Sequence, residues 1–199
     1  MSVPNTFGGA VLDRAGIRRR DATWVQERLT DPRSRTLALT RDGILMTGPA
    51  TAPQLVRLSP AEIPGRLDTG VFLGVEPDGT ALFAVDVEHV HDRHRPLTPG
   101  ARAVSLREAG AVLSPEMSGL AAYASALVGW HRAHPHCSRC GALTDVREAG
   151  HIRRCPVCGT EHHPRTDPVV IMIVLDGDRV LLGRQASWPA GRYSALAGF

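Results

Sequence analysis

The residues of this chain that are best suited to metal chemistry are its four cysteines, which form two pairs with the spacing Cys-x-x-Cys. Cys137 and Cys140 make the first pair, and Cys155 and Cys158 make the second pair after fourteen intervening residues. A Cys-x-x-Cys turn places two thiolates on one side of an ion, and tetrahedral Zn²⁺ takes four such sulfurs at about 2.3 Å. The spacing therefore predicts one zinc site made by all four cysteines.

A redox-active pair and disulfide bonds are the alternatives to zinc. Disulfides are disfavoured because nothing at the N-terminus reads as a secretory signal, and thiols inside cells stay reduced. Sulfur would fill all four positions around the ion, which leaves no position for a catalytic water. We therefore expect a structural zinc. Three nearby histidines are not expected to be ligands because the cysteines already satisfy the ion: His131, His134 and His136.

The overall composition is that of an ordinary globular protein. The chain has 199 residues, of which 43% are hydrophobic, and no apolar run approaches the roughly 18 residues of a membrane span. We expect no membrane partner and a cytoplasmic location. All of the basic residues are arginines, and the net charge of +3 is too small to indicate nucleic-acid binding by itself.

The first hundred residues predict a β-rich domain. Residues 36–47 and 71–87 each hold two apolar segments around a short turn, which is typical of a hairpin. Short helices are predicted to begin at Asp21 and at Ser59, where Ser59-Pro60-Ala61-Glu62 has the form of a capping box. Residues 88–100 read as a solvated loop, and its histidines lack partners at metal-binding spacing: His89, His91 and His94.

The segments after residue 113 predict the elements that position the cysteines. Ser114 caps a long helix whose apolar face leads toward Cys137, and we expect this helix to pack the first domain against the cysteine region. Residues 151–154 predict a strand that leads into the second cysteine pair. Residues 169–175 form a continuous apolar run, typical of a strand buried on both faces, and strands at 179–183 and 193–199 follow.

The order of these elements and two short motifs resemble the NADH pyrophosphatases, also called NAD diphosphatases or NAD-capped RNA hydrolases, of the Nudix hydrolase superfamily. The motifs are His162-His163-Pro164-Arg165-Thr166-Asp167-Pro168 and Ser194-Ala195-Leu196-Ala197-Gly198-Phe199. Residues 130–199 carry the specific match. The resemblance implies an α+β fold with a β-rich N-terminal domain at residues 1–133, a zinc ribbon at 134–163, and the first strands of a Nudix α/β/α sandwich at 164–199.

The resemblance also implies a reaction. Members hydrolyse the pyrophosphate of NADH or NAD to AMP and nicotinamide mononucleotide, and some remove an NAD cap from RNA. Mg²⁺ or Mn²⁺ polarises the phosphates and activates the attacking water. The family holds these ions with glutamates in the pattern G-x5-E-x7-R-E-U-x-E-E-x-G-U, and its members form homodimers.

This sequence departs from that pattern. Gly198 aligns with the first glycine of the motif, Phe199 follows as the last residue, and no Arg-Glu-x-x-Glu-Glu occurs earlier. We therefore expect the 199 residues to be inactive alone. We also expect the segment from Val169 to be poorly folded or prone to aggregation by itself, unless a partner subunit covers it.

Three further positions match family residues. Ala197 corresponds to a residue whose backbone carbonyl touches a catalytic metal, although it is a core strand residue in any case. Arg102 corresponds to a substrate-contacting arginine of the family. The alternative is that Arg102 is only a solvated surface residue. His163 stands where relatives often have a substrate-contacting tyrosine, and its alternative role is to cover the ribbon.

A different class of function remains open. Zinc ribbons also serve as binding modules for nucleic acids or proteins, and four arginines would give this ribbon a basic surface: Arg139, Arg147, Arg153 and Arg154. A glutamate-rich helix after residue 199 would favour the enzyme.

Overall fold

The computed structural model describes residues 5–63, 70–88 and 98–198. Contacts divide the chain into two compact units, Met1–Pro164 and Arg165–Phe199. Most of the loop predicted at residues 88–100, with its three histidines, lies outside the described residues.

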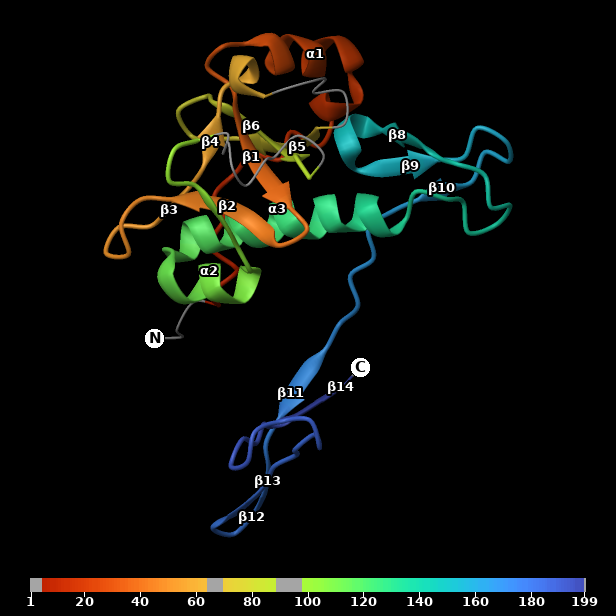
Figure 1. Ribbon diagram of the computed structural model, residues 1–199. Helices are drawn as coiled ribbons and strands as arrows, with labels where there is room; N and C mark the ends of the chain where they lie inside the picture. Colours follow the sequence, from red (N-terminus) through yellow and green to blue (C-terminus); the bar gives the residue numbers. More distant parts are fainter. Residues whose placement is uncertain (1–4, 64–69, 89–97, 199) are drawn as a thin grey trace. The chain divides into compact units, whose positions relative to one another are not determined.

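A seven-stranded sheet forms the centre of the first unit (Figure 1). Five strands follow the order β3-β2-β1-β6-β5, while β4 pairs with β1 and β7 pairs with β2. Strands β1 and β6 are parallel, and the other pairs are antiparallel. Both predicted hairpins are confirmed as β1–β2 and β5–β6. The strands are β1 (Arg35–Thr40), β2 (Gly43–Thr47), β3 (Gln54–Leu55), β4 (Arg57–Leu58), β5 (Val71–Val75), β6 (Ala81–Asp86) and β7 (Arg102–Val104).

The two faces of this sheet hold separate hydrophobic clusters because neighbouring side chains in a strand point to opposite faces. Leu37 and Leu39 of β1 belong to the larger cluster, whereas Ala38 between them belongs to a second cluster. A third cluster contains Phe72 and Phe83, whose rings meet edge to face. The sheet is therefore covered on both sides.

The predicted helix at Asp21 is confirmed as α1 (Ala22–Thr30). The Asp21 carboxylate accepts hydrogen bonds from the backbone N–H groups of Thr23 and Trp24, which otherwise lack partners in a first helical turn. Trp24 then meets the ring of Phe72 edge to face, with the ring centroids 5.5 Å apart. Two short 3₁₀ helices complete this region, η1 (Arg18–Arg20) and η2 (Pro60–Glu62), the second with the capping box predicted at Ser59.

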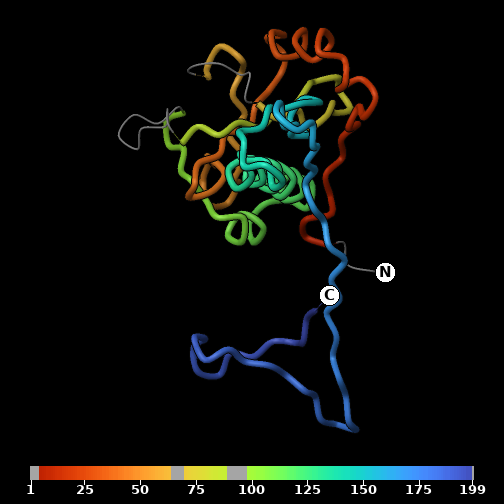
Figure 2. The backbone as a smooth tube through the Cα atoms, turned by 90° about the vertical axis from the view of Figure 1, so that its right-hand side faces the viewer, coloured from red at the N-terminus to blue at the C-terminus, as the bar shows by residue number. Residues whose placement is uncertain are grey.

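The long helix predicted after Ser114 is confirmed as α3 (Pro115–Ala133). Its buried residues Leu120, Ala124 and Leu127 join the larger cluster of the sheet. Figure 2 looks approximately along this helix, with the sheet on one side and α2 (Leu106–Val112) on the other. Helix α2 is not predicted from the sequence, although Ser105 and Glu108 form a capping box that marks its start.

Beyond α3 the chain forms a small three-stranded sheet in the order β10-β9-β8. The strand predicted at residues 151–154 is confirmed as β9. A tight turn, η4, connects β8 to β9. The elements are β8 (Asp145–Arg147), η4 (Glu148–Gly150), β9 (Ile152–Arg154) and β10 (Glu161–His162).

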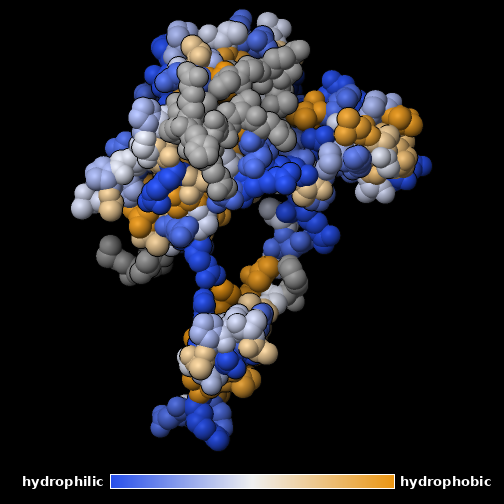
Figure 3. Space-filling view, in the orientation of Figure 1, coloured by the Kyte–Doolittle hydropathy of each residue, from blue (hydrophilic) through white to orange (hydrophobic). Residues whose placement is uncertain are grey.

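The second unit contains two antiparallel strand pairs, β11–β14 and β12–β13. The prediction of one continuous strand buried on both faces is wrong, because the apolar run breaks at Ile173 into two strands with different partners and all of their side chains are exposed. Figure 3 shows apolar surface on this unit. The strands are β11 (Val170–Met172), β12 (Val174–Asp176), β13 (Arg179–Leu181) and β14 (Leu196–Gly198).

Candidate metal centre and the ribbon joint

The four cysteine sulfurs meet at one point of the first unit. All four Sγ atoms lie within 4.8 Å of one another. Cys137 and Cys158 are 3.6 Å apart at sulfur, and Cys140 lies 3.4 Å from Cys155. A tetrahedron of sulfurs about 2.3 Å from a zinc ion has edges of about 3.8 Å, so the arrangement fits Zn²⁺ with no position left for a further ligand.

Each cysteine pair is shaped by a glycine. The N–H of Gly141 donates to the carbonyl of Cys137, and the N–H of Gly159 donates to the carbonyl of Cys155. Both glycines have positive φ, at 75° and 73°. Because a residue with a Cβ adopts this left-handed conformation only at a cost, glycine is the residue that lets the chain turn back beside the sulfurs.

The second pair has additional support from a hydroxyl. Thr160 Oγ1 lies 3.2 Å from Cys158 Sγ, where its hydrogen can be donated to a thiolate. This hydrogen bond lowers the pKa of the Cys158 thiol to about 6, which favours the deprotonated form that binds metal. Cys137 and Cys155 are buried, whereas Cys140 is exposed.

The turn η4 attaches the ribbon to the large sheet. Glu148, Ala149 and Gly150 have φ values of 46°, 51° and 95°, so three consecutive residues are left-handed. Ala149 packs against the cluster of Phe72 and Phe83. A left-handed residue with a Cβ costs about 1–2 kcal/mol, and the packing of Ala149 offsets part of that cost.

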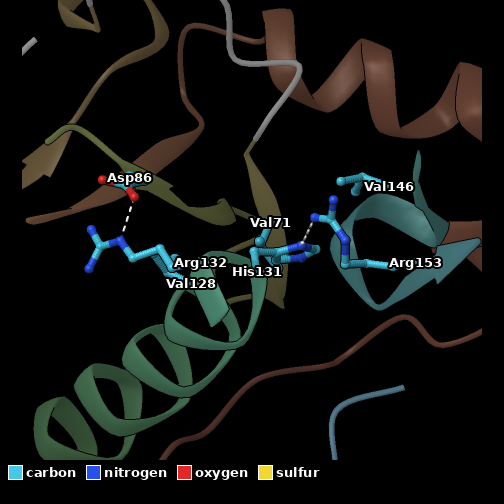
Figure 4. Close-up of a pocket in the computed structure, with 7 residues that line it drawn as sticks. All are labelled: Val71, Asp86, Val128, His131, Arg132, Val146 and Arg153. Atoms are coloured by element: carbon cyan, nitrogen blue, oxygen red, sulfur yellow. Dashed lines mark hydrogen bonds and ion pairs between the residues drawn. The ribbon is translucent and has the colours of Figure 1, made fainter. Parts of the chain in front are cut away.

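The C-terminal end of α3 is bonded to the same turn (Figure 4). His131 Nε2 lies 2.7 Å from the carbonyl oxygen of Gly150, and Arg153 donates from Nη1 to His131 Nδ1 over 2.9 Å. An arginine has only donors, so Nδ1 must accept and Nε2 must carry the proton. Burial lowers the pKa of His131, the hydrogen bond to Gly150 opposes this change, and the charge of Arg153 lowers the pKa further. His131 is therefore neutral.

Arg153 is itself buried, with 7% of its surface exposed. Its other donors bond neutral groups, namely Oγ1 of Thr144 at 2.7 Å and the carbonyl oxygen of Thr144 at 2.9 Å. Among the residues that the structure describes, none forms an ion pair with it within 4.0 Å. The predicted basic ribbon surface is thus wrong at this position, because Arg153 points inward to hold the ribbon on α3.

A second histidine connects the ribbon to the large sheet, and in this case the donor belongs to the ribbon. Nε2 of His151 lies 2.8 Å from the carbonyl oxygen of Phe72 in β5, to which it donates a hydrogen bond. Burial lowers the pKa of His151, the hydrogen bond to Phe72 opposes this change, and Arg19 and Arg14 lower the pKa further. We call the contact formed by Phe72, His131, Gly150, His151 and Arg153 the ribbon joint.

A cavity of about 300 Å³ lies beside the joint, between α3, the large sheet and the ribbon. Arg132 lines it and is held by Asp86 and by the carbonyl oxygens of Thr40 and Leu39. The lining residues, shown in Figure 4, are Val71, Asp86, Val128, His131, Arg132, Val146 and Arg153. The polar groups in this lining form hydrogen bonds within the protein. The lining therefore gives no indication of a ligand.

The remaining sequence-predicted site residues are not gathered at the cysteines. Arg102 lies exposed in β7 opposite Met46, and His163 is exposed just after β10. Ala197 lies in β14 opposite Ile171, in the second unit. Its side chain is exposed, so the prediction of a core residue is wrong here. None of the predicted histidine neighbours belongs to the four-sulfur group found among the described residues.

The residues of the joint are not predicted from the sequence. His131 is predicted there not to be a metal ligand, with no other role assigned, and Arg153 is predicted as a surface charge. Their partners lie 19 and 22 positions away in the sequence, and His151 lies 79 positions from Phe72. The one available signal was a histidine on the apolar face of a helix that leads into a metal site.

Two family models match the chain. Residues 33–130 match the NADH pyrophosphatase-like rudimentary NUDIX domain, and residues 132–162 match the NADH pyrophosphatase zinc ribbon domain. The second match and the four-sulfur cluster together support a structural zinc. No described helix is both long and apolar enough to cross a membrane.

Curated relatives agree with these models. The NAD-capped RNA hydrolase NudC of Mycobacterium tuberculosis is 36% identical over 195 residues, covering 94% of this chain and 58% of the relative. The human and mouse proteins named NAD(P)H pyrophosphatase NUDT13, mitochondrial, are 36% and 37% identical over 67% and 72% of this chain. These alignments cover 41% and 46% of those relatives, so the chain spans about half the length of the relatives it matches. The two domain models match in this order along the chain, and the relatives carry matching names. The chain therefore belongs to the NADH pyrophosphatase family of Nudix proteins.

Proposed function

We propose that the protein to which these residues belong hydrolyses the pyrophosphate of NADH or NAD, releasing AMP and nicotinamide mononucleotide. The observation that carries the proposal is the succession of two NADH pyrophosphatase domains, with all four cysteines of the second brought together. Relatives named for hydrolysis of NAD(P)H and of NAD-capped RNA support the same substrate class. The reaction would use Mg²⁺ or Mn²⁺ to polarise the phosphates.

The 199 residues would provide the scaffold of that enzyme. In this proposal, Zn²⁺ on Cys137, Cys140, Cys155 and Cys158 fixes the ribbon. The Ala197 carbonyl would face a catalytic ion, and Arg102 and His163 would contact substrate. The glutamate pattern that the family uses for its catalytic ions does not occur within the 199 residues, so we propose that they are inactive by themselves.

The test compares the 199-residue chain with the same chain extended by the C-terminal part of the mycobacterial relative. Each is incubated with NADH and Mg²⁺ or Mn²⁺, and AMP and the mononucleotide are separated by chromatography. We expect products only from the extended chain. The matched control carries glutamine in place of the motif glutamates in the extension, and it should be inactive.

Two outcomes would contradict the proposal. Equal hydrolysis by the short and extended chains would show that the scaffold role is wrong. An extended chain that folds, binds zinc and yet releases no AMP from NADH would contradict the substrate. We also propose that the protein acts on NAD-capped RNA and forms a homodimer, as the family resemblance implies. Repeating the assay with NAD-capped RNA tests this substrate, and sedimentation of the extended chain tests the homodimer.

A further inference from the structure

The ribbon joint is crossed by two histidines that each donate from Nε2 to a backbone carbonyl oxygen. His131 of α3 donates to Gly150 of the ribbon, and His151 of the ribbon donates to Phe72 of β5. Gly150 and His151 are neighbours in the sequence, so the two bonds attach the same point of the ribbon to two different elements of the NUDIX-like domain. His131 must also keep Nδ1 unprotonated, because Arg153 donates there. His151 would still donate to Phe72 if it were protonated, so its charge is opposed by burial and by Arg19 and Arg14.

A protonated His131 is incompatible with the observed geometry. Its Nδ1 would carry a hydrogen that points at the guanidinium of Arg153, whose Nη1 lies 2.9 Å away and already donates there. The contact would then place two cations and two donors against each other in a buried site. Arg153 cannot relieve the conflict by losing a proton, because an arginine stays charged.

The other charged groups around His131 do not remove this conflict. Arg132 on the same helix and Asp86 from β6 share the adjacent cavity, and they are bonded to each other. Around His151 the charges are Arg14 and Arg19, which oppose protonation, and Glu148, which favours it. Glu148 is paired with Arg20 at 3.2 Å, which weakens its attraction for a second cation.

We propose that the ribbon joint is a pH-sensitive latch, closed when His131 and His151 are neutral and released from the NUDIX-like domain when they take up protons. The lowered pKa values of both histidines support this direction. A group whose pKa is lowered by folding binds protons more weakly in the closed state than in the open state. The closed joint is then fully stable above the ordinary histidine pKa of about 6.5 and loses stability as pH falls below it.

The size of the effect follows from this linkage. Each histidine reduces the closed-to-open ratio by about tenfold for each pH unit below about 6.5, until the pH reaches its lowered pKa. Between pH 7.5 and 5.5, the loss is at most about tenfold for one responsive histidine and at most about a hundredfold for two.

Hydrogen exchange of the zinc-loaded chain tests the latch. Protection factors, which correct for the intrinsic pH dependence of exchange, are compared at pH 7.5, 6.5 and 5.5 for the amides of η4 and β9. Those of β1 serve as an internal control. Excess zinc is kept in solution, and bound metal is measured at each pH. We expect protection to fall at the joint, by up to about a hundredfold, and to stay constant in β1.

The matched variant replaces both histidines, His131→Gln and His151→Gln. A glutamine amide donates through Nε2 and accepts through Oε1 but does not titrate in this range. The pH response should disappear. An unchanged response in the variant, or a loss of protection that follows zinc release, would overturn the latch.

Long-range ¹⁵N spectra of the wild-type histidines give an independent answer if the double variant does not fold. We expect His131 as the Nε2–H form with a midpoint below 6.5. The Nδ1–H form, or midpoints for both histidines at or above 6.5, would also overturn the proposal.

Discussion

Arg153 donates to Nδ1 of His131 across 2.9 Å, and this bond joins the strand that precedes the second cysteine pair to the end of the longest helix. Arg153 is two residues before Cys155, so this buried side chain links the metal site to α3, while His151 and Ala149 link the ribbon to the large sheet directly. The zinc centre and the NUDIX-like domain are coupled by hydrogen bonds between neutral groups and a single buried cation.

Replacing that cation should loosen the ribbon. Arg153→Met keeps the aliphatic volume but leaves the Thr144 carbonyl and His131 Nδ1 without a donor, and each unsatisfied buried group costs about 1–3 kcal/mol. Relief from burying a charge offsets part of this loss. We expect the free energy of unfolding to fall by about 2 kcal/mol in urea titrations.

Arg154→Met is the matched control, because Arg154 is the next residue of β9 and is exposed. Its substitution should leave the free energy of unfolding nearly unchanged. If both substitutions lowered the free energy of unfolding equally, the buried contacts of Arg153 would not stabilise the ribbon more than an exposed arginine does.

What the sequence could predict depends on how locally each feature is determined. The cysteine site was predictable because two Cys-x-x-Cys turns constrain their own geometry within a few residues. The long helix was predictable from its Ser114 cap and apolar period, whereas α2 has only seven residues and was missed despite its capping box.

The joint and the second unit were predicted less well because their environment is not local. Arg153 was assigned to the surface by its charge, and only the fold brings Thr144 and His131 around it. In the apolar run, composition predicted burial on both faces, yet the described strands β11 and β12 each have one partner and exposed side chains. Burial depends on which segments cover a strand, and the strand itself does not encode them.

Gly150 should be intolerant of any side chain. Its φ of 95° is left-handed, and an added Cβ would lie 2.8 Å from a methyl group of Val71. Gly150→Ala therefore combines backbone strain with a collision in the joint, and we expect a loss of about 2–4 kcal/mol in the free energy of unfolding.

Gly79→Ala separates these two contributions. Gly79 has a similar φ of 88°, but no atom within 4 Å would meet its Cβ. It should cost only the strain, about 1–2 kcal/mol. Comparable losses in the two variants, measured by chemical denaturation, would argue against close packing of Gly150 on Val71.

Removing zinc should release the ribbon and leave the large sheet folded. The sheet has its own clusters on both faces, whereas the ribbon is held by short strands, the four sulfurs and the joint. We expect metal analysis to find one zinc per chain. Hydrogen-exchange protection in β8 to β10 should be lost after chelation or in the variant Cys155→Ser.

The control variant is Ser138→Ala, which changes a residue inside the first pair that is not a ligand, and it should keep its zinc. Loss of protection across β1 and β6 as well would show that the sheet depends on the metal.

The exposed apolar strands should make the chain self-associate. Ile171 and Leu175 expose 77% and 68% of their surfaces, on strands that belong to sheets of only two strands. Such pairs are marginally stable, and their open apolar faces favour contacts with other chains. Threonine has a β-branched shape suited to a strand, and it presents less apolar surface than isoleucine or leucine. The double variant Ile171→Thr and Leu175→Thr should therefore reduce concentration-dependent association in sedimentation velocity.

Val157→Thr makes a similar change at a side chain that is 74% exposed on the ribbon. This control should associate like the wild type, because a single exposed valine outside the strands adds no continuous surface. An equal reduction in the control would place the contact elsewhere than on β11 and β12.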